Sequence, residues 1–134
     1  MKSLRLALID DENDLAEMFS YYLADLGHEV VPFNSAKTAL DALKKTEVDI
    51  IITDLKMPFL SGIHLIQELT KFHKRPLPAI LLTVESDGEF SESEEKENLK
   101  KLGFLEIINK TNGLEKLAQT ITDYSASTDS LMFA

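Results

Sequence analysis

Short apolar runs recur along the chain, and each is followed by a stretch whose apolar residues return every three or four positions. Unbroken apolar runs predict strands that are buried on both faces of a parallel sheet, whereas the longer period predicts amphipathic helices. The predicted strands are 4–9, 29–33, 48–54, 79–83 and 105–109. The predicted helices have their apolar stripes at 15–26, 36–43, 63–69, up to about 102, and 114–121. Strands and helices therefore alternate throughout.

This alternation predicts an α/β, doubly wound (βα)5 fold, since a closed barrel would need about eight such units. Pro32 lacks the amide hydrogen that a central strand must donate, so the second strand is expected at an edge. A flavodoxin-like order, 2-1-3-4-5, satisfies that condition and opens a crevice between strands one and three. We expect one domain over residues 1–124, followed by a polar and flexible tail at 125–134.

Charge and composition narrow the classes of partner. The 134 residues include 14 lysines and arginines against 23 aspartates and glutamates, which gives a net charge of -9. Such a balance argues against direct binding to nucleic acid and favours cations or proteins as partners. The chain has no cysteine, which excludes disulfides and thiolate metal sites. The first apolar run meets Asp10 too early for a signal sequence or membrane span, so we expect a cytoplasmic protein without membrane insertion.

Polar residues that could bind a ligand or take part in a reaction follow the predicted strands. They are Asp10, Asp11, Asp54, Thr83 and Lys110. Right-handed crossovers bring the carboxyl ends of parallel strands to one edge of the sheet, so these side chains should meet there. Converging carboxylates need compensating positive charge, and Mg²⁺ prefers oxygen ligands of this kind. An alternative role for the first two aspartates is to cap the following helix.

A carboxylate held between a cation and an ammonium group is placed to attack phosphorus and form an aspartyl phosphate. Asp54 ends the most apolar strand, and Lys110 supplies the ammonium group. The hydroxyl group of Thr83 adds a hydrogen-bond donor for charge that develops on the phosphoryl oxygens.

In this order and at these strand ends, the residues resemble the receiver domain of the response regulators of two-component signalling. The motif comprises Asp10-Asp11, the stretch from Asp54 to Pro58 with Gly62 downstream, Thr83 and Lys110. The resemblance covers roughly residues 3 to 124, which is nearly the whole chain.

The resemblance implies that Asp54 accepts a phosphoryl group from a histidine kinase or a histidine phosphotransfer protein. It implies a metal site for Mg²⁺ made by Asp10, Asp11, Asp54 and the main-chain carbonyl of Lys56. It also implies that Thr83 and Lys110 bind the phosphoryl group, and that the face made by helix four, strand five and helix five changes its affinity for a downstream protein.

Three positions depart from the family pattern. Ile107 stands where an aromatic residue is usual, and Thr111 stands where a proline with a cis peptide bond usually follows the lysine. Val84 replaces the small residue that usually follows the threonine. Because Val84 is branched, we expect slower access of water and a longer-lived phosphoryl state.

The sequence leaves several functions open. The leading hypothesis is a stand-alone signalling domain that is not an enzyme and acts through protein contacts. Alternatives are the receiver fragment of a longer regulator, and a pseudo-receiver that binds partners without phosphorylation. Ile107, Thr111 and the acidic insertion between Thr83 and Lys110 favour the pseudo-receiver, whereas the complete set of strand-end site residues opposes it. A phosphatase with an aspartyl-phosphate intermediate is disfavoured, since such enzymes need a second aspartate where this chain has Lys56.

Overall fold

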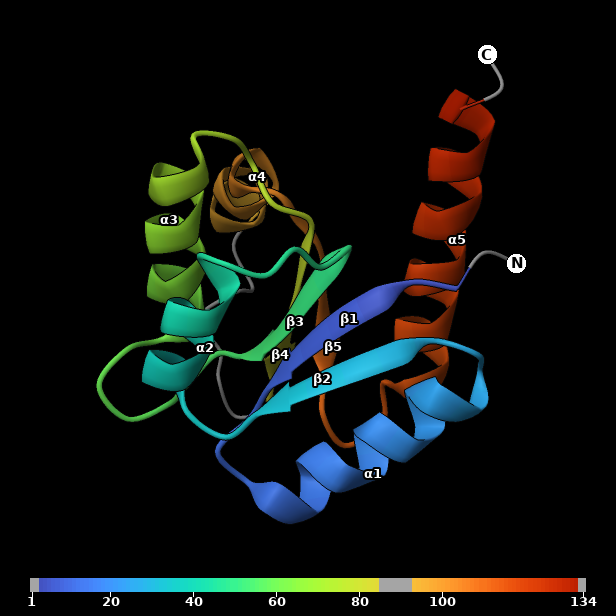
Figure 1. Cartoon of the computed structure of the whole chain (residues 1–134), viewed down its shortest axis with the longest axis horizontal. Coiled ribbons are helices and arrows are strands. Elements are labelled where there is room, and N and C mark those ends of the chain that lie inside the picture. The colour runs from blue at the N-terminus through green and yellow to red at the C-terminus, as the bar shows by residue number, and fades with distance from the viewer. Residues whose placement is uncertain (1–2, 85–92, 133–134) are drawn as a thin grey trace.

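The computed structural model describes residues 3–84 and 93–132 and confirms the predicted architecture (Figure 1). All strand pairs are parallel, and the strand order is β2-β1-β3-β4-β5. The strands are β1 (Arg5–Ile9), β2 (Glu29–Phe33), β3 (Ile50–Asp54), β4 (Ala79–Thr83) and β5 (Phe104–Asn109). The helices are α1 (Asn13–Asp25), α2 (Ala36–Leu43), α3 (Gly62–His73), α4 (Ser93–Leu102) and α5 (Leu114–Met132).

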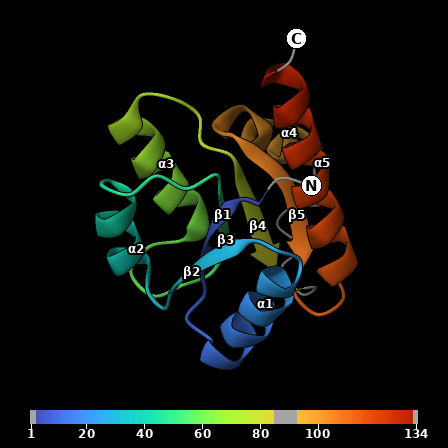
Figure 2. The ribbon, with the colours of Figure 1, turned by 45° about the vertical axis from the view of Figure 1, so that its right-hand side comes forward.

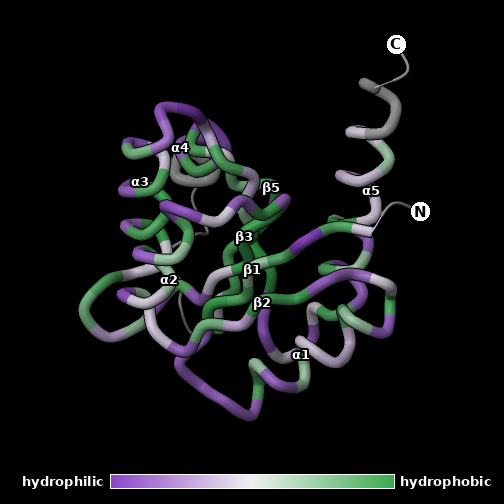
Figure 3. The backbone as a smooth tube through the Cα atoms, viewed as in Figure 1, coloured by the Kyte–Doolittle hydropathy of each residue, from purple (hydrophilic) through white to green (hydrophobic). Residues whose placement is uncertain are grey.

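The helices cover the two faces of the sheet unequally. Helices α2, α3 and α4 lie on one face and α1 and α5 on the other (Figures 1 and 2). Successive residues of β3 point to opposite faces, so Ile51 packs with the three-helix layer while Ile50 and Ile52 pack with the two-helix layer. The hydropathy colouring shows the consequence, with apolar strands in the middle and polar segments mostly on the outside (Figure 3).

The position of each strand follows from its residues. Every residue of β3 and β4 is buried, as expected for central strands covered on both faces. Strand β2, which carries Pro32 opposite Leu8, lies at an edge and is more exposed, as predicted. The carboxyl ends of the strands therefore share one edge of the sheet.

The C-terminal segment differs from the prediction. Residues 125–132 were expected in an irregular tail, but α5 continues to Met132 (Figure 1). Ser125 is fully buried, and the Thr128 hydroxyl donates a 2.8 Å hydrogen bond to the carbonyl of Tyr124 one turn earlier. No glycine or proline interrupts this stretch, so the helix has no local reason to stop.

Two further observations concern the predicted elements. Most of the acidic stretch predicted as a loop at 85–95 lies outside the described residues, and the following helix begins at Ser93. Among the described helices, none combines the length and hydrophobicity that would be needed to span a membrane.

Candidate functional site

Four residues predicted for the site lie at the carboxyl edge of the sheet. Asp54 and Thr83 are the last residues of β3 and β4, Asp10 follows β1, and Lys110 follows β5. Main-chain bonds continue the sheet past these ends: the amide of Lys110 donates to the carbonyl of Thr83 at 2.8 Å, and that of Asp10 donates to Phe33 at 3.1 Å. The sheet itself thus fixes the spacing of these side chains.

Lys110 lies at the centre of a buried network of charges. Its Nζ is 3.0 Å from Asp10 Oδ2, 3.2 Å from Asp54 Oδ2 and 3.6 Å from Glu12 Oε1. The side chains of Lys110 and Asp10 are 2% and 0% exposed, whereas that of Glu12 is 60% exposed. Asp54 is also buried, so three of these four charged groups are removed from water.

This burial shifts the protonation equilibria. Burial raises the pKa of Asp54 to about 6; the ammonium of Lys110 opposes the shift, and the charges of Asp10 and Asp11 add to it. Burial works to lower the pKa of Lys110, but its pairing with Asp10 and Asp54 outweighs this effect and raises that pKa above the usual range. The positive charge of one ammonium group therefore does not fully balance the negative charge of the carboxylates.

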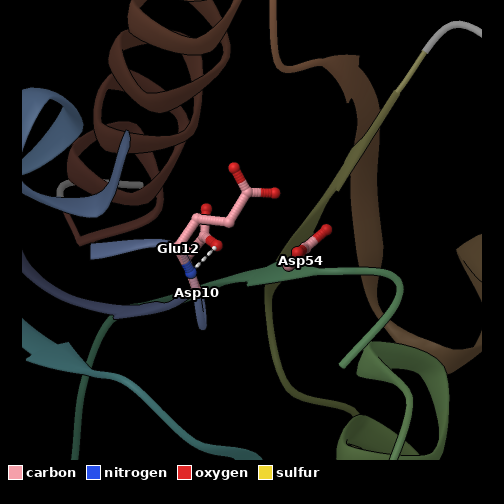
Figure 4. Close-up of side chains that lie close together, drawn as sticks. All are labelled: Asp10, Glu12 and Asp54. Atoms are coloured by element: carbon pink, nitrogen blue, oxygen red, sulfur yellow. Dashed lines mark hydrogen bonds between the residues drawn. The ribbon is translucent and has the colours of Figure 1, made fainter. Parts of the chain in front are cut away.

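Three carboxylates at this edge have the composition of a site for a hard divalent cation. One oxygen from each of Asp10, Glu12 and Asp54 lies within 4.8 Å of the other two (Figure 4). Asp10 Oδ2 is buried and, in the part of the chain that the structure describes, accepts no hydrogen bond despite its ion pair with Lys110. Oxygen ligands and an excess of negative charge together fit Mg²⁺.

The sequence pattern predicted Asp10 and Asp11 for this site and missed Glu12. Asp11 is exposed and does not belong to the three-carboxylate cluster, although its charge contributes to the raised pKa of Asp54. The available signal was that Glu12 is a third acidic residue directly after β1. Only the turn into α1 decides which of these carboxylates faces Asp54.

The loop from β3 to α3 turns tightly beside Asp54. Phe59 has φ of 71° and a fully exposed side chain, and Leu60 donates a 2.9 Å hydrogen bond to the carbonyl of Pro58 across it. A Cβ atom on Gly62 would overlap the carbonyl oxygen of Asp54, so only glycine fits there. The main-chain carbonyl of Lys56 in this loop stays a predicted metal ligand.

The departures from the family pattern occupy the β4 and β5 side of the site. Val84 is 38% exposed beside the buried Thr83. Ile107 is half-buried against the core on the α2, α3 and α4 face. In the turn after β5, Thr111 stands in place of a proline, and its amide and hydroxyl donate hydrogen bonds to Asn109 Oδ1 at 2.8 and 2.6 Å.

Comparison with known proteins gives one consistent answer. The family model described as response regulator receiver domain matches residues 6–122. The regulatory protein VanR of Enterococcus faecium is 32% identical over 79 residues, which is 59% of this chain and 33% of VanR. The sensory/regulatory protein RpfC of Xanthomonas campestris pv. campestris is 26% identical over 98% of this chain and 18% of RpfC. The chain spans about a third of the length of the first curated relatives that it matches.

Solved structures that are similar to this chain point to the same family. A response regulator receiver domain protein from Clostridium thermocellum superimposes with a TM-score of 0.78 and 26% identity, covering 95% of this chain and 98% of the other. The chemotaxis response regulator CheY4 of Vibrio cholerae superimposes with a TM-score of 0.71 and 26% identity, covering 92% of this chain and 99% of the other. With the strand order and the acidic cluster, these matches show that the chain belongs to the response regulator receiver domain family of two-component signalling proteins.

Proposed function

We propose that the chain is a Mg²⁺-dependent phosphoacceptor switch in which Asp54 receives a phosphoryl group from a histidine kinase or histidine phosphotransfer protein. The observation that carries the proposal is the placement of the Asp54 carboxylate. It ends a buried strand, lies 3.2 Å from the Lys110 ammonium group and shares a 4.8 Å cluster with two more carboxylates. Such a carboxylate is a nucleophile with positive charge close by.

The reaction exchanges one bond to phosphorus for another. A carboxylate oxygen of Asp54 attacks the phosphorus atom in line, the P–O bond forms, and the P–N bond to the donor histidine breaks with its electron pair leaving on nitrogen. Lys110, already paired with Asp54, would bind a phosphoryl oxygen. The Thr83 hydroxyl, on the neighbouring strand end, would donate a hydrogen bond to another.

The metal-binding role is proposed for Asp10, Asp11, Asp54 and the main-chain carbonyl of Lys56. When bound, Mg²⁺ neutralises excess carboxylate charge and stabilises the negative oxygens of the phosphoryl group. The excess of carboxylates over ammonium groups at this edge and the raised pKa of Asp54 support a cation there.

Phosphorylation is proposed to signal through protein contacts rather than through turnover of a substrate. The downstream partner would bind the face made by α4, β5 and α5. A cytoplasmic location follows from this role, because the proposed donors act on cytoplasmic domains.

The test is intact mass after incubation of the chain with acetyl phosphate, with and without Mg²⁺. We expect one added phosphoryl group that requires Mg²⁺, none on Asp54→Ala, and normal labelling of Asp49→Ala, whose aspartate precedes β3 at the opposite edge. If the wild type stays unmodified where a control receiver domain is labelled, the chain is an interaction module that works without phosphorylation.

A further inference from the structure

The carboxyl ends of α2 and α3 form a surface that the phosphoacceptor role does not use. The two helices lie side by side (Figures 1 and 2), and His73, the last residue of α3, donates a 2.9 Å hydrogen bond from Nε2 to the carbonyl of Leu43, the last residue of α2. Arg75 follows α3 and lines a cavity with Arg5, the first residue of β1. These helix ends therefore lie at the amino edge of the sheet, opposite the carboxylate site.

Positive charge is concentrated at these helix ends. Five of the 14 lysines and arginines gather here, in a chain whose net charge is -9. The basic patch that they form consists of Lys44, Lys45, Lys71, Lys74 and Arg75. Lys44 is half-buried and the other four are exposed. Within the part of the chain that the structure describes, none of the five forms an ion pair, so their charges are available to a partner.

Helix chemistry explains only part of this arrangement. A cation in the last turn of a helix interacts favourably with the helix dipole, which accounts for Lys71. Lys45 and Arg75 lie beyond the C-cap residues of their helices. Lys44 is a C-cap residue, but its Nζ lies over the ring of Phe72 on the neighbouring helix, 5.4 Å from the ring centre. The patch is therefore more than a set of charges that stabilise helix ends.

Neighbouring acidic residues do not neutralise the basic patch. Asp41 and Glu68 lie in the preceding turns of α2 and α3, and Glu47 lines the cavity beside the patch. All three are exposed, and none forms an ion pair with a residue that the structure describes. Asp49, which also lines the cavity, accepts a 2.7 Å hydrogen bond from the amide of Arg5. The cations of the patch therefore outnumber the acidic residues that border them.

The charge and the exposed ring at this surface define the kind of partner that fits it. Phe72 is 53% exposed, so its ring offers apolar contact area beside the cations. An acidic segment that carries one aromatic or aliphatic side chain complements both features. A lipid surface or a nucleic acid fits less well, because such an extended polyanion would also meet the carboxylates of Asp41, Glu47 and Glu68.

We propose that the basic patch binds a short acidic segment of a partner protein and that an apolar side chain of this segment packs on Phe72. The cations attract and orient the acidic residues, and the ring adds contact area whose contribution does not depend on salt. This interaction surface is additional to the proposed function and does not depend on it, because the patch and Asp54 lie at opposite edges of the sheet.

The test is a titration of the ¹⁵N-labelled full chain, followed by nuclear magnetic resonance, with a short synthetic peptide in which glutamates and aspartates flank one phenylalanine. We expect saturable shifts confined to residues 43–48 and 71–78. The dissociation constant should rise with salt, because the Debye length shortens from about 30 Å at 0.01 M to about 8 Å at 0.15 M. The same peptide with glutamines and asparagines should not bind. No saturable shifts at low salt, or shifts centred elsewhere, would overturn the proposal.

Charge variants test whether the basic patch is the binding site. Lys74→Gln combined with Arg75→Gln removes two exposed cations, and we expect the dissociation constant of the acidic peptide to rise about 3- to 10-fold at low salt. The matched control is Lys100→Gln combined with Lys101→Gln, which removes two exposed cations from the last turn of α4. The control should stay within about twofold of the wild type. Equal losses in both double variants would indicate general attraction and overturn the proposal.

An aromatic variant tests the apolar contact separately. In Phe72→Ala we expect the dissociation constant to rise about 2- to 10-fold, while its dependence on salt stays that of the wild type. The control is Tyr21→Ala, which removes a 70% exposed aromatic residue from α1 and should leave the affinity unchanged. Wild-type affinity in Phe72→Ala would overturn the assigned contact.

Competing ligands distinguish a protein segment from other sources of negative charge. Inorganic phosphate and vesicles that contain phosphatidylglycerol are added to the peptide complex at constant ionic strength, and we expect neither to displace the peptide. Displacement by the vesicles would assign the patch to a membrane surface and overturn the proposal. Asp54→Ala should bind the peptide as the wild type does, so this result is separate from the outcome of labelling with acetyl phosphate.

Discussion

The two edges of the sheet carry similar ion pairs in opposite environments. At the amino edge, Arg5 Nε lies 2.8 Å from Glu29 Oε2, with both side chains about half exposed to solvent. At the carboxyl edge, Lys110 pairs with Asp10 and Asp54 at 3.0 and 3.2 Å, with all three side chains buried. The distances are comparable, so the difference between the two edges is their access to water.

This difference separates an ordinary surface pair from a candidate site. Water screens the Arg5–Glu29 pair, which therefore contributes little to stability. The buried network includes more carboxylates than ammonium groups, and desolvation of such charges costs free energy that their attraction does not fully return. A cluster that is costly to fold and matches the ligands of a cation is better explained by binding than by stability.

The largest expected effect comes from removing the Lys110 ammonium group at the buried carboxyl edge. Lys110→Met leaves Asp10 and Asp54 buried without a counter-charge, so we expect the free energy of unfolding to fall by about 3 to 5 kcal/mol at pH 8 with a chelator present. Urea denaturation followed by circular dichroism measures the loss. Lys116→Met, at a more exposed lysine that pairs with Glu106, is the control and should change little.

A smaller effect of opposite sign is expected from Asp54→Asn. The folded pKa of Asp54, about 6, lies above its usual value of 3.8, so its favourable contribution is complete below pH 4 and is lost as pH rises through 6. In chelator at pH 8, Asp54→Asn should therefore be more stable than the wild type by about 1 to 3 kcal/mol. The advantage should shrink at pH 4.5 in parallel urea titrations, and an advantage independent of pH would contradict the assigned cause.

Mg²⁺ should stabilise the folded chain by binding at the carboxyl edge and not at the amino edge. A cation that binds only the folded chain adds about 1.4 kcal/mol at ten times its dissociation constant, which raises Tm by roughly 3 to 8 °C. Differential scanning calorimetry in a Mg²⁺ series measures the shift. Asp54→Ala should lose most of it and Glu29→Gln should keep it; equal shifts in both variants would indicate unspecific binding.

The smallest effect is expected at the exposed pair. Glu29→Gln removes its charge, and because solvent already screens the pair, we expect Tm to change by no more than about 2 °C. Thermal melts at low and high salt make the comparison. A large, salt-independent loss would show that the amino edge depends on its ion pair as the carboxyl edge does.

The fold and most of the strand-end residues of the site could be predicted from the amino-acid sequence. The unbroken apolar run before Asp54 identified a central strand, and Pro32 identified an edge strand, because these properties depend on local composition and backbone donors. Since parallel strands end at one edge, the sequence also predicted that Asp10, Asp54 and Lys110 would meet there, which the structure confirms.

Which further side chains join Asp10, Asp54 and Lys110 depends on how the elements pack. Asp11 and Glu12 are adjacent and equally acidic, so no periodicity distinguishes them; the turn into α1 places Glu12 in the cluster and Asp11 outside it. The burial of Ser125 within α5 is likewise a tertiary contact, which a polar sequence does not reveal. Local patterns specify elements, whereas contacts between distant residues arise only when the elements pack.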